Sequence, residues 1–77
     1  MRLADAVVHR LRAIMEERGL KPYYFHKNGG IAKSTISQLL NGKQQKVTLD
    51  LLFQFTSTLN ISLKDFFDDP IFGEITD

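Results

Sequence analysis

The chain has 77 residues, contains no cysteine and carries a formal net charge of +1. This length allows one domain with a small core and no deep catalytic pocket, and the lack of cysteine excludes disulfides and thiolate metal sites. No apolar run reaches the ~18 residues of a membrane span, and the N-terminus lacks the apolar core of a signal peptide. We therefore expect a cytoplasmic protein.

The small net charge hides opposite charges in the two halves of the chain. Residues 1–46 carry nine Lys/Arg and three acids, which gives +6, whereas residues 47–77 carry one lysine and six acids, which gives −5. Between Arg18 and Lys46 there are six basic residues, both ends included, and no acidic one. Such a segment is typical of a surface that faces nucleic acid, and a solvated basic surface is the alternative interpretation.

The first predicted helix covers residues 4–18. Its apolar residues recur at the spacing of a single helix face: Ala4, Val7, Val8, Leu11, Ile14 and Met15. Gly19 is expected to end this helix.

Residues 22–42 are predicted to form two short helices joined by a tight turn. The first begins at Pro22, because proline suits the first helical position, and Gly29 and Gly30 are expected to end it. The second runs from about Lys33 to residue 41, and Gly42 closes it.

The second of these helices has two contrasting faces. One is an apolar stripe that consists of Ile36, Leu39 and Leu40, which lie three and four residues apart. Its apolar partners would be Phe25 and Ile31, which precede this helix. The other carries hydrogen-bonding side chains and no acid: Lys33, Ser34, Ser37, Gln38 and Asn41.

Two further helices are predicted after a polar loop at residues 44–46. Thr48 is a good N-cap for a helix at about 49–59, whose apolar face would consist of Leu49, Leu52, Phe55, Thr56 and Leu59. Asn60 is expected to end that helix in a left-handed conformation. Ser62 and Asp65 resemble a capping box that starts a short fifth helix, and Pro70 is expected to end it.

The stretch from residue 22 to residue 42 resembles the helix-turn-helix of the phage-repressor family (Xre-like, Cro/cI-type). The matching positions are Phe25, Gly30, Ile31, the run from Ser34 to Ser37, and Asn41 to Lys43, and the resemblance covers roughly residues 7–67. It implies an all-α fold, a compact five-helix lambda-repressor-like DNA-binding domain. We expect this single domain to occupy residues 1–77, with an apolar and acidic tail at residues 68–77.

The resemblance also implies a function: a sequence-specific regulator of transcription that binds double-stranded DNA, expected to be a repressor. Residues 33–41 would enter the major groove. Base contacts would come from side chains that can donate or accept at base edges, namely Lys33, Ser34, Ser37 and Gln38. Phosphate contacts would come from Tyr23, Thr35, Asn41, Lys43 and Lys46. The alternative is that the two serines are ordinary surface residues and that, of Tyr23 and Tyr24, one ring packs on the first helix and the other is simply exposed.

A homodimer is expected, because three or four base contacts per monomer are too few to specify a unique genomic site. The expected interface consists of apolar residues that the core does not obviously need: Leu51, Phe53, Phe72 and Ile75. The alternative is that the tail folds back and covers these residues within one chain.

Several positions depart from the family pattern. Met15 and Leu40 stand where the family has an Arg and a Glu that pair, so we predict an apolar contact between them. His26 replaces an alanine at the crossing of the two helices, where it would either tilt the recognition helix or be accommodated by a backbone hydrogen bond. Pro22 replaces a glutamine that contacts phosphate, so that side-chain contact should be absent.

Other functions have weaker support in the sequence. His9 and His26 are the only histidines, and no nucleophile motif accompanies them, so we do not expect an enzyme, a metal, a cofactor or a small-molecule ligand. The competing interpretation is a protein-interaction module, of the antitoxin or repressor-antagonist type, that uses the same fold and binds through its acidic C-terminal half.

Overall fold

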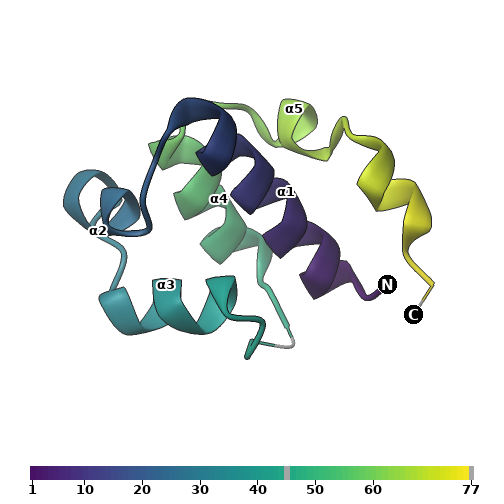
Figure 1. The fold of residues 1–77 in the computed structure, drawn as a ribbon, viewed down its shortest axis with the longest axis horizontal. Helices are drawn as coiled ribbons and strands as arrows, with labels where there is room; N and C mark the ends of the chain where they lie inside the picture. The colour runs from purple at the N-terminus through teal and green to yellow at the C-terminus, as the bar shows by residue number, and fades with distance from the viewer. Residues whose placement is uncertain (45, 77) are drawn as a thin grey trace.

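The computed structural model describes residues 1–44 and 46–76, so Gln45 of the predicted polar loop and Asp77 lie outside it. Every regular element in the described residues is helical (Figure 1): α1 (Leu3–Arg18), α2 (Tyr23–Gly29), α3 (Lys33–Leu40), α4 (Leu49–Thr58), α5 (Leu63–Phe67) and the 3₁₀-helix η1 (Pro70–Glu74). The predicted all-α, five-helix fold is confirmed, with η1 as an additional short helix. None of these helices combines the length and apolarity needed to cross a membrane.

A single apolar cluster connects the five α-helices. Phe25 of α2, Phe55 of α4 and Phe66 of α5 are completely buried in it, and the rings of Phe25 and Phe55 have centroids 4.7 Å apart. The predicted apolar faces of α1 and α3 are buried in the same cluster. Met15 and Leu40 are both among its buried members, as their predicted apolar contact requires.

The end of α2 shows why two consecutive glycines are needed. Gly30 has φ 67° and forms the left-handed C-cap of the helix, a conformation that glycine adopts without steric cost. The helix thus ends at the two glycines, as predicted, with Gly29 as its last helical residue. A Cβ atom on Gly29 would overlap the side chain of Thr58 on α4. Gly29 therefore lets α2 approach α4 closely.

The predicted caps of the C-terminal helices are confirmed. The hydroxyl of Thr48 accepts a hydrogen bond from the Leu51 N–H at 3.1 Å, and the hydroxyl of Ser62 accepts one from the Asp65 N–H at 3.0 Å. Asn60 has φ 59°, the left-handed conformation expected after α4. These local interactions determine where α4 and α5 begin.

Two predictions about these helices were wrong. Leu49 is 62% exposed rather than part of the core, because it is the first residue of α4 and lies at the edge of its apolar face. Pro70 does not end α5, which stops at Phe67, but opens η1. Proline also suits the first position of a helix, and Asp69 caps this one by accepting from the Ile71 N–H at 2.9 Å.

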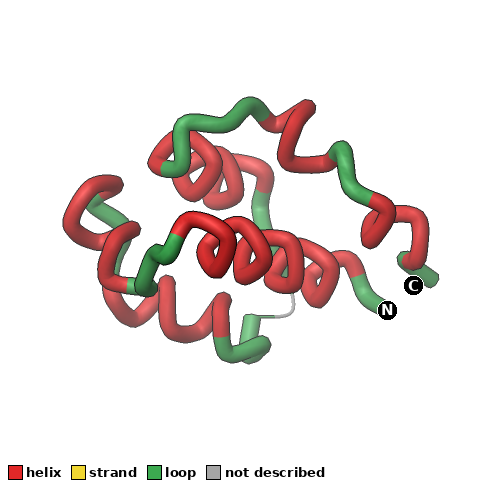
Figure 2. The backbone as a smooth tube through the Cα atoms, turned by 45° about the horizontal axis from the view of Figure 1, so that its top comes forward, coloured by secondary structure: helices red, strands yellow, loops and turns green. Residues whose placement is uncertain are grey.

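The tail folds back on its own chain. Phe72 of η1 packs against the rings of Phe66 and Phe67, with centroid distances of 5.7 and 4.9 Å. The Thr76 N–H donates to the Met1 carbonyl at 3.0 Å, and the N-terminal amine donates to the Thr76 hydroxyl at 3.1 Å. The two ends of the chain therefore lie side by side (Figure 2).

Candidate nucleic-acid interface

The helix α3 lies along one edge of the bundle, and α5 and η1 lie along the opposite edge (Figures 1 and 2). Its inner face is buried through Ile36, Leu39 and Leu40. The four residues predicted to contact bases are all exposed: Lys33, Ser34, Ser37 and Gln38. Ser34 and Gln38 lie one turn apart on the side opposite the buried stripe, so the surface of α3 most distant from the core is polar and uncharged.

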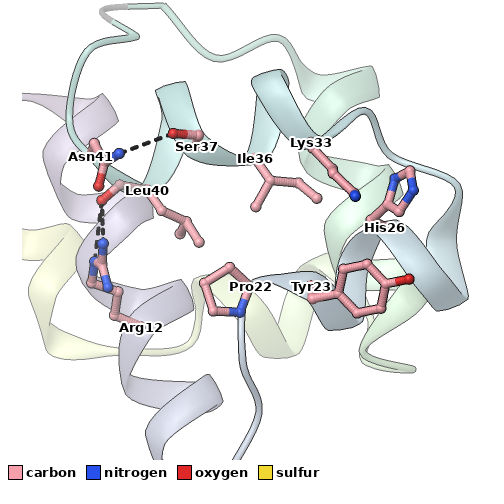
Figure 3. Close-up of a pocket in the computed structure, with 9 residues that line it drawn as sticks. All are labelled: Arg12, Pro22, Tyr23, His26, Lys33, Ile36, Ser37, Leu40 and Asn41. Atoms are coloured by element: carbon pink, nitrogen blue, oxygen red, sulfur yellow. Dashed lines mark hydrogen bonds between the residues drawn. The ribbon is translucent and has the colours of Figure 1, made fainter.

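A groove of about 280 Å³ opens beside α3, between α1 and the start of α2 (Figure 3). The side of α3 that runs from Lys33 to Asn41 forms one wall, and Arg12, Pro22, Tyr23 and His26 complete the lining. None of the described residues that line it is acidic. The lining of the groove therefore presents no carboxylate beside α3.

Arg12 ties the end of α3 to α1. Its Nε and Nη2 atoms donate to the carbonyl oxygen of Leu40 at 3.2 and 2.6 Å (Figure 3). Leu40 is the last residue of α3, where the helix dipole favours a cation. At the positions where the resemblance implied an ion pair, the chain therefore has two other interactions, the burial of Met15 and Leu40 and this charged cap. Sequence analysis missed Arg12, although it lies three residues before Met15 and hence on the same side of α1.

His26 connects α2 to the turn that precedes α3. Its Nδ1 atom lies 2.9 Å from the carbonyl oxygen of Ile31, and because a carbonyl can only accept, Nδ1 carries a proton and donates. The second of the two expected outcomes is therefore observed, a backbone hydrogen bond that accommodates the larger side chain. The His26 ring also contacts Tyr23, with centroids 5.6 Å apart, and the Lys33 ammonium lies 5.4 Å from the centroid of the Tyr23 ring.

Comparison with known protein families identifies this arrangement. A family model described as the Cro/C1-type HTH DNA-binding domain matches residues 10–70. The chain belongs to this family. No curated protein and no solved structure matches it. The resemblance seen in the sequence is thus confirmed, and the Cro/C1-type domain identifies a regulator that binds double-stranded DNA.

The residues of this Cro/C1-type domain that were predicted to contact phosphate lie around α3. Tyr23 precedes it, Asn41, Lys43 and Lys46 follow it, and all four are exposed, whereas Thr35 is half-buried. The side-chain amide of Asn41 donates to the Ser37 hydroxyl at 3.1 Å. The neighbouring tyrosine, at position 24, is half-buried and donates its hydroxyl to the Thr58 carbonyl at 3.4 Å.

Arginines and lysines have different positions in the Cro/C1-type domain. Arg10 and Arg18 donate to carbonyl oxygens of Phe66 and Leu59, at 2.9 and 2.5 Å, so these cations hold the bundle together, as Arg12 does. The positive charge around α2 and α3 comes from exposed lysines: Lys21, Lys27, Lys33, Lys43 and Lys46. Lysines at these positions can neutralise phosphates without disturbing the fold.

The four predicted dimer residues differ in exposure. Phe53 is 56% exposed, Leu51 and Ile75 are half-buried, and Phe72 packs within its own chain. Leu49 is also exposed and lies one turn before Phe53 on α4. The exposed apolar surface of α4 therefore centres on Phe53 and Leu49.

Within residues 1–44 and 46–76, no group of three or more His, Asp or Glu side chains is arranged to hold a metal ion.

Proposed function

We propose that this Cro/C1-type domain is a sequence-specific transcriptional regulator that reads the major groove with α3 and acts as a repressor. The observation that carries the proposal is the outer surface of α3, which is exposed, rich in hydrogen-bonding groups and free of carboxylates. An α-helix fits the major groove, where base edges present donors and acceptors. Acidic residues lie in α5, in η1 and in the segment between them, at the opposite edge of the bundle from α3 and away from a bound polyanion: Asp65, Asp68, Asp69 and Glu74.

Each polar side chain on α3 has a chemical role in this proposal. Lys33 donates to guanine O6 or N7, and Gln38 forms a bidentate pair with adenine N6 and N7. Ser34 and Ser37 can donate or accept at any base. The amide of Asn41 already orients the Ser37 hydroxyl, so these two side chains would approach the DNA as a pair.

Phosphate contacts would anchor the domain on both sides of α3. No side chain caps the start of this helix, so its first N–H groups, which lack partners within the helix, can bind a phosphate oxygen. Thr35 lies in the same first turn, Tyr23 lies beside it, and Asn41, Lys43 and Lys46 follow the helix. Such contacts add affinity without sequence information and weaken as salt rises.

We also propose that residues 1–77 form one domain that acts as a homodimer. The packing of η1 against α1 and the hydrogen bonds between the two ends of the chain support a single unit. Phe53 supplies exposed apolar surface for the dimer contact, whereas Leu51 and Ile75 are half-buried and Phe72 is the least available of the four. Repression requires only that the dimer occupy a promoter, which the DNA-binding surface alone can provide.

The test uses a duplex selected by the wild-type protein from a random pool. Substituting both Lys33→Ala and Gln38→Ala should weaken binding by about 30-fold or more, because each good base contact contributes ~1–3 kcal/mol. Lys64→Ala is the matched control, since Lys64 is an exposed lysine on α5, and its affinity should change less than about twofold. Unchanged binding by the double variant at low salt would contradict the proposal and favour the protein-interaction module.

A further inference from the structure

Three side chains form a continuous chain of contacts from the turn to the start of α3. The His26 ring is fixed by its hydrogen bond to the Ile31 carbonyl, and the ring of Tyr23 lies against it at 5.6 Å. The ammonium of Lys33 lies 5.4 Å from the Tyr23 centroid. In Figure 3 the Lys33 side chain extends from α3 toward α2 and the groove, close to both rings.

We propose that Tyr23 is a positioning residue for Lys33, with His26 supporting the tyrosine ring. This inference rests on the proposed function and deepens it, because it gives the aromatic ring of Tyr23 a role in base recognition that is separate from the phosphate contact of its hydroxyl. A cation within about 6 Å of an aromatic centroid is attracted by the negative face of the ring. The ring therefore holds the ammonium on the α2 side of α3.

The consequence concerns specificity. A lysine without such a contact is a flexible point charge that can bind acceptors in many directions, and its side chain loses rotamer freedom when it binds one of them. Held by Tyr23, Lys33 approaches the DNA from a restricted direction and loses less freedom on binding. The domain should then prefer a guanine at one position of each half-site and discriminate less when the ring is absent.

Two substitutions separate the ring from the hydroxyl. Tyr23→Phe keeps an aromatic face and removes the hydroxyl, whereas Tyr23→Leu keeps only the apolar bulk. Tyr23 is 56% exposed and outside the core, so both variants should keep the wild-type melting temperature to within a few degrees. Each would be measured on the selected duplex and on one with the preferred guanine pair replaced, in the wild-type and Lys33→Ala backgrounds.

We expect Tyr23→Phe to lose only the phosphate contact of the hydroxyl, which weakens binding to both duplexes equally. Tyr23→Leu should bind the selected duplex about two- to fivefold more weakly than Tyr23→Phe, the change typical of an exposed cation–π contact. This difference between the two variants should vanish in the Lys33→Ala background, and the preference for guanine should fall only with leucine. If the phenylalanine variant is as weak as the leucine variant, or if the difference persists without Lys33, the proposal is wrong.

An NMR measurement on the free protein keeps this test separate from the proposed function. The methylene protons next to the Lys33 ammonium should show an upfield ring-current shift in wild type and Tyr23→Phe, and the shift should disappear in Tyr23→Leu. Its absence in wild type would overturn the positioning role even if DNA binding is strong. Its presence, with no duplex bound by the wild-type protein, would support the contact and refute the proposed function.

Discussion

Substituting Gly29→Ala tests the packing of α2 on α4, which sets the position of the whole helix pair. In a helix, alanine is favoured over glycine by about 1 kcal/mol. The new methyl group, however, would overlap the Thr58 hydroxyl, which donates to the Gln54 carbonyl at 2.7 Å. Overpacking costs typically ~1–3 kcal/mol, and losing that hydrogen bond costs about 1 kcal/mol.

The net effect expected for Gly29→Ala is a loss of about 2 kcal/mol in the free energy of unfolding. For a domain of this size such a loss lowers the melting temperature by about 8–16 °C. The measurement is thermal and urea unfolding followed by circular dichroism, with the variant and wild type at the same pH and salt.

Two other glycines and two double variants provide the controls. A Cβ on Gly73 would meet no atom within 4 Å, so Gly73→Ala should change stability by less than about 0.5 kcal/mol. Gly30→Ala meets no neighbour but has φ 67°, so it should cost about 1–2 kcal/mol through backbone strain alone. Adding Thr58→Ala should relieve the Gly29→Ala penalty and not that of Gly30→Ala. An equal penalty for Gly29→Ala with and without Thr58 would refute the close approach.

Three further predictions concern the site and the caps. Arg12→Ala removes both hydrogen bonds to the Leu40 carbonyl and should cost about 1 kcal/mol of stability, measured by urea unfolding; no loss would mean that water replaces the guanidinium. Thr48→Ala removes the acceptor for the Leu51 N–H and should also cost about 1 kcal/mol, visible as a lower urea midpoint with an unchanged slope. Lys43→Ala should reduce the slope of log affinity against log salt by about 0.9, and an unchanged slope would show that this lysine contacts no phosphate.

The positions of the helices could be predicted because local rules determine them. The apolar spacing in α1 and α3 needs a helix to form one face, and the hydroxyls of Thr48 and Ser62 satisfy N–H groups only three residues away. The family resemblance added the turn and the order of the elements. These features depend on short stretches of chain, so the sequence alone was sufficient.

Most features that were missed, wrong or left open depend on how segments of the chain pack in three dimensions. The exposure of Leu49 is decided by which neighbours reach the first turn of α4. Arg12 binds a carbonyl 28 residues away, a contact that no spacing rule reveals. The two outcomes left open for His26 were resolved only by its distance to the Ile31 carbonyl.

The candidate site also combines features that the sequence predicted with contacts that it did not predict. Sequence reasoning identified the polar face of α3, because an apolar stripe on one side of a helix leaves the other side for solvent. It did not predict the contact between the Lys33 ammonium and the Tyr23 ring, because this contact depends on the orientation of α2 relative to α3. Phe72 was predicted to lie in the dimer interface, but its ring packs against Phe67 of the same chain, a contact that composition could not indicate.

The most direct measurement is the selection of bound duplexes from a random pool by the wild-type chain at low salt. If α3 reads the major groove in a homodimer, the selected duplexes will share a palindromic site whose half-sites are centred about one helical turn, ~10 base pairs, apart. Retention of duplexes without any enriched motif, or no retention at all, would contradict the assignment of α3 as a reader of DNA sequence.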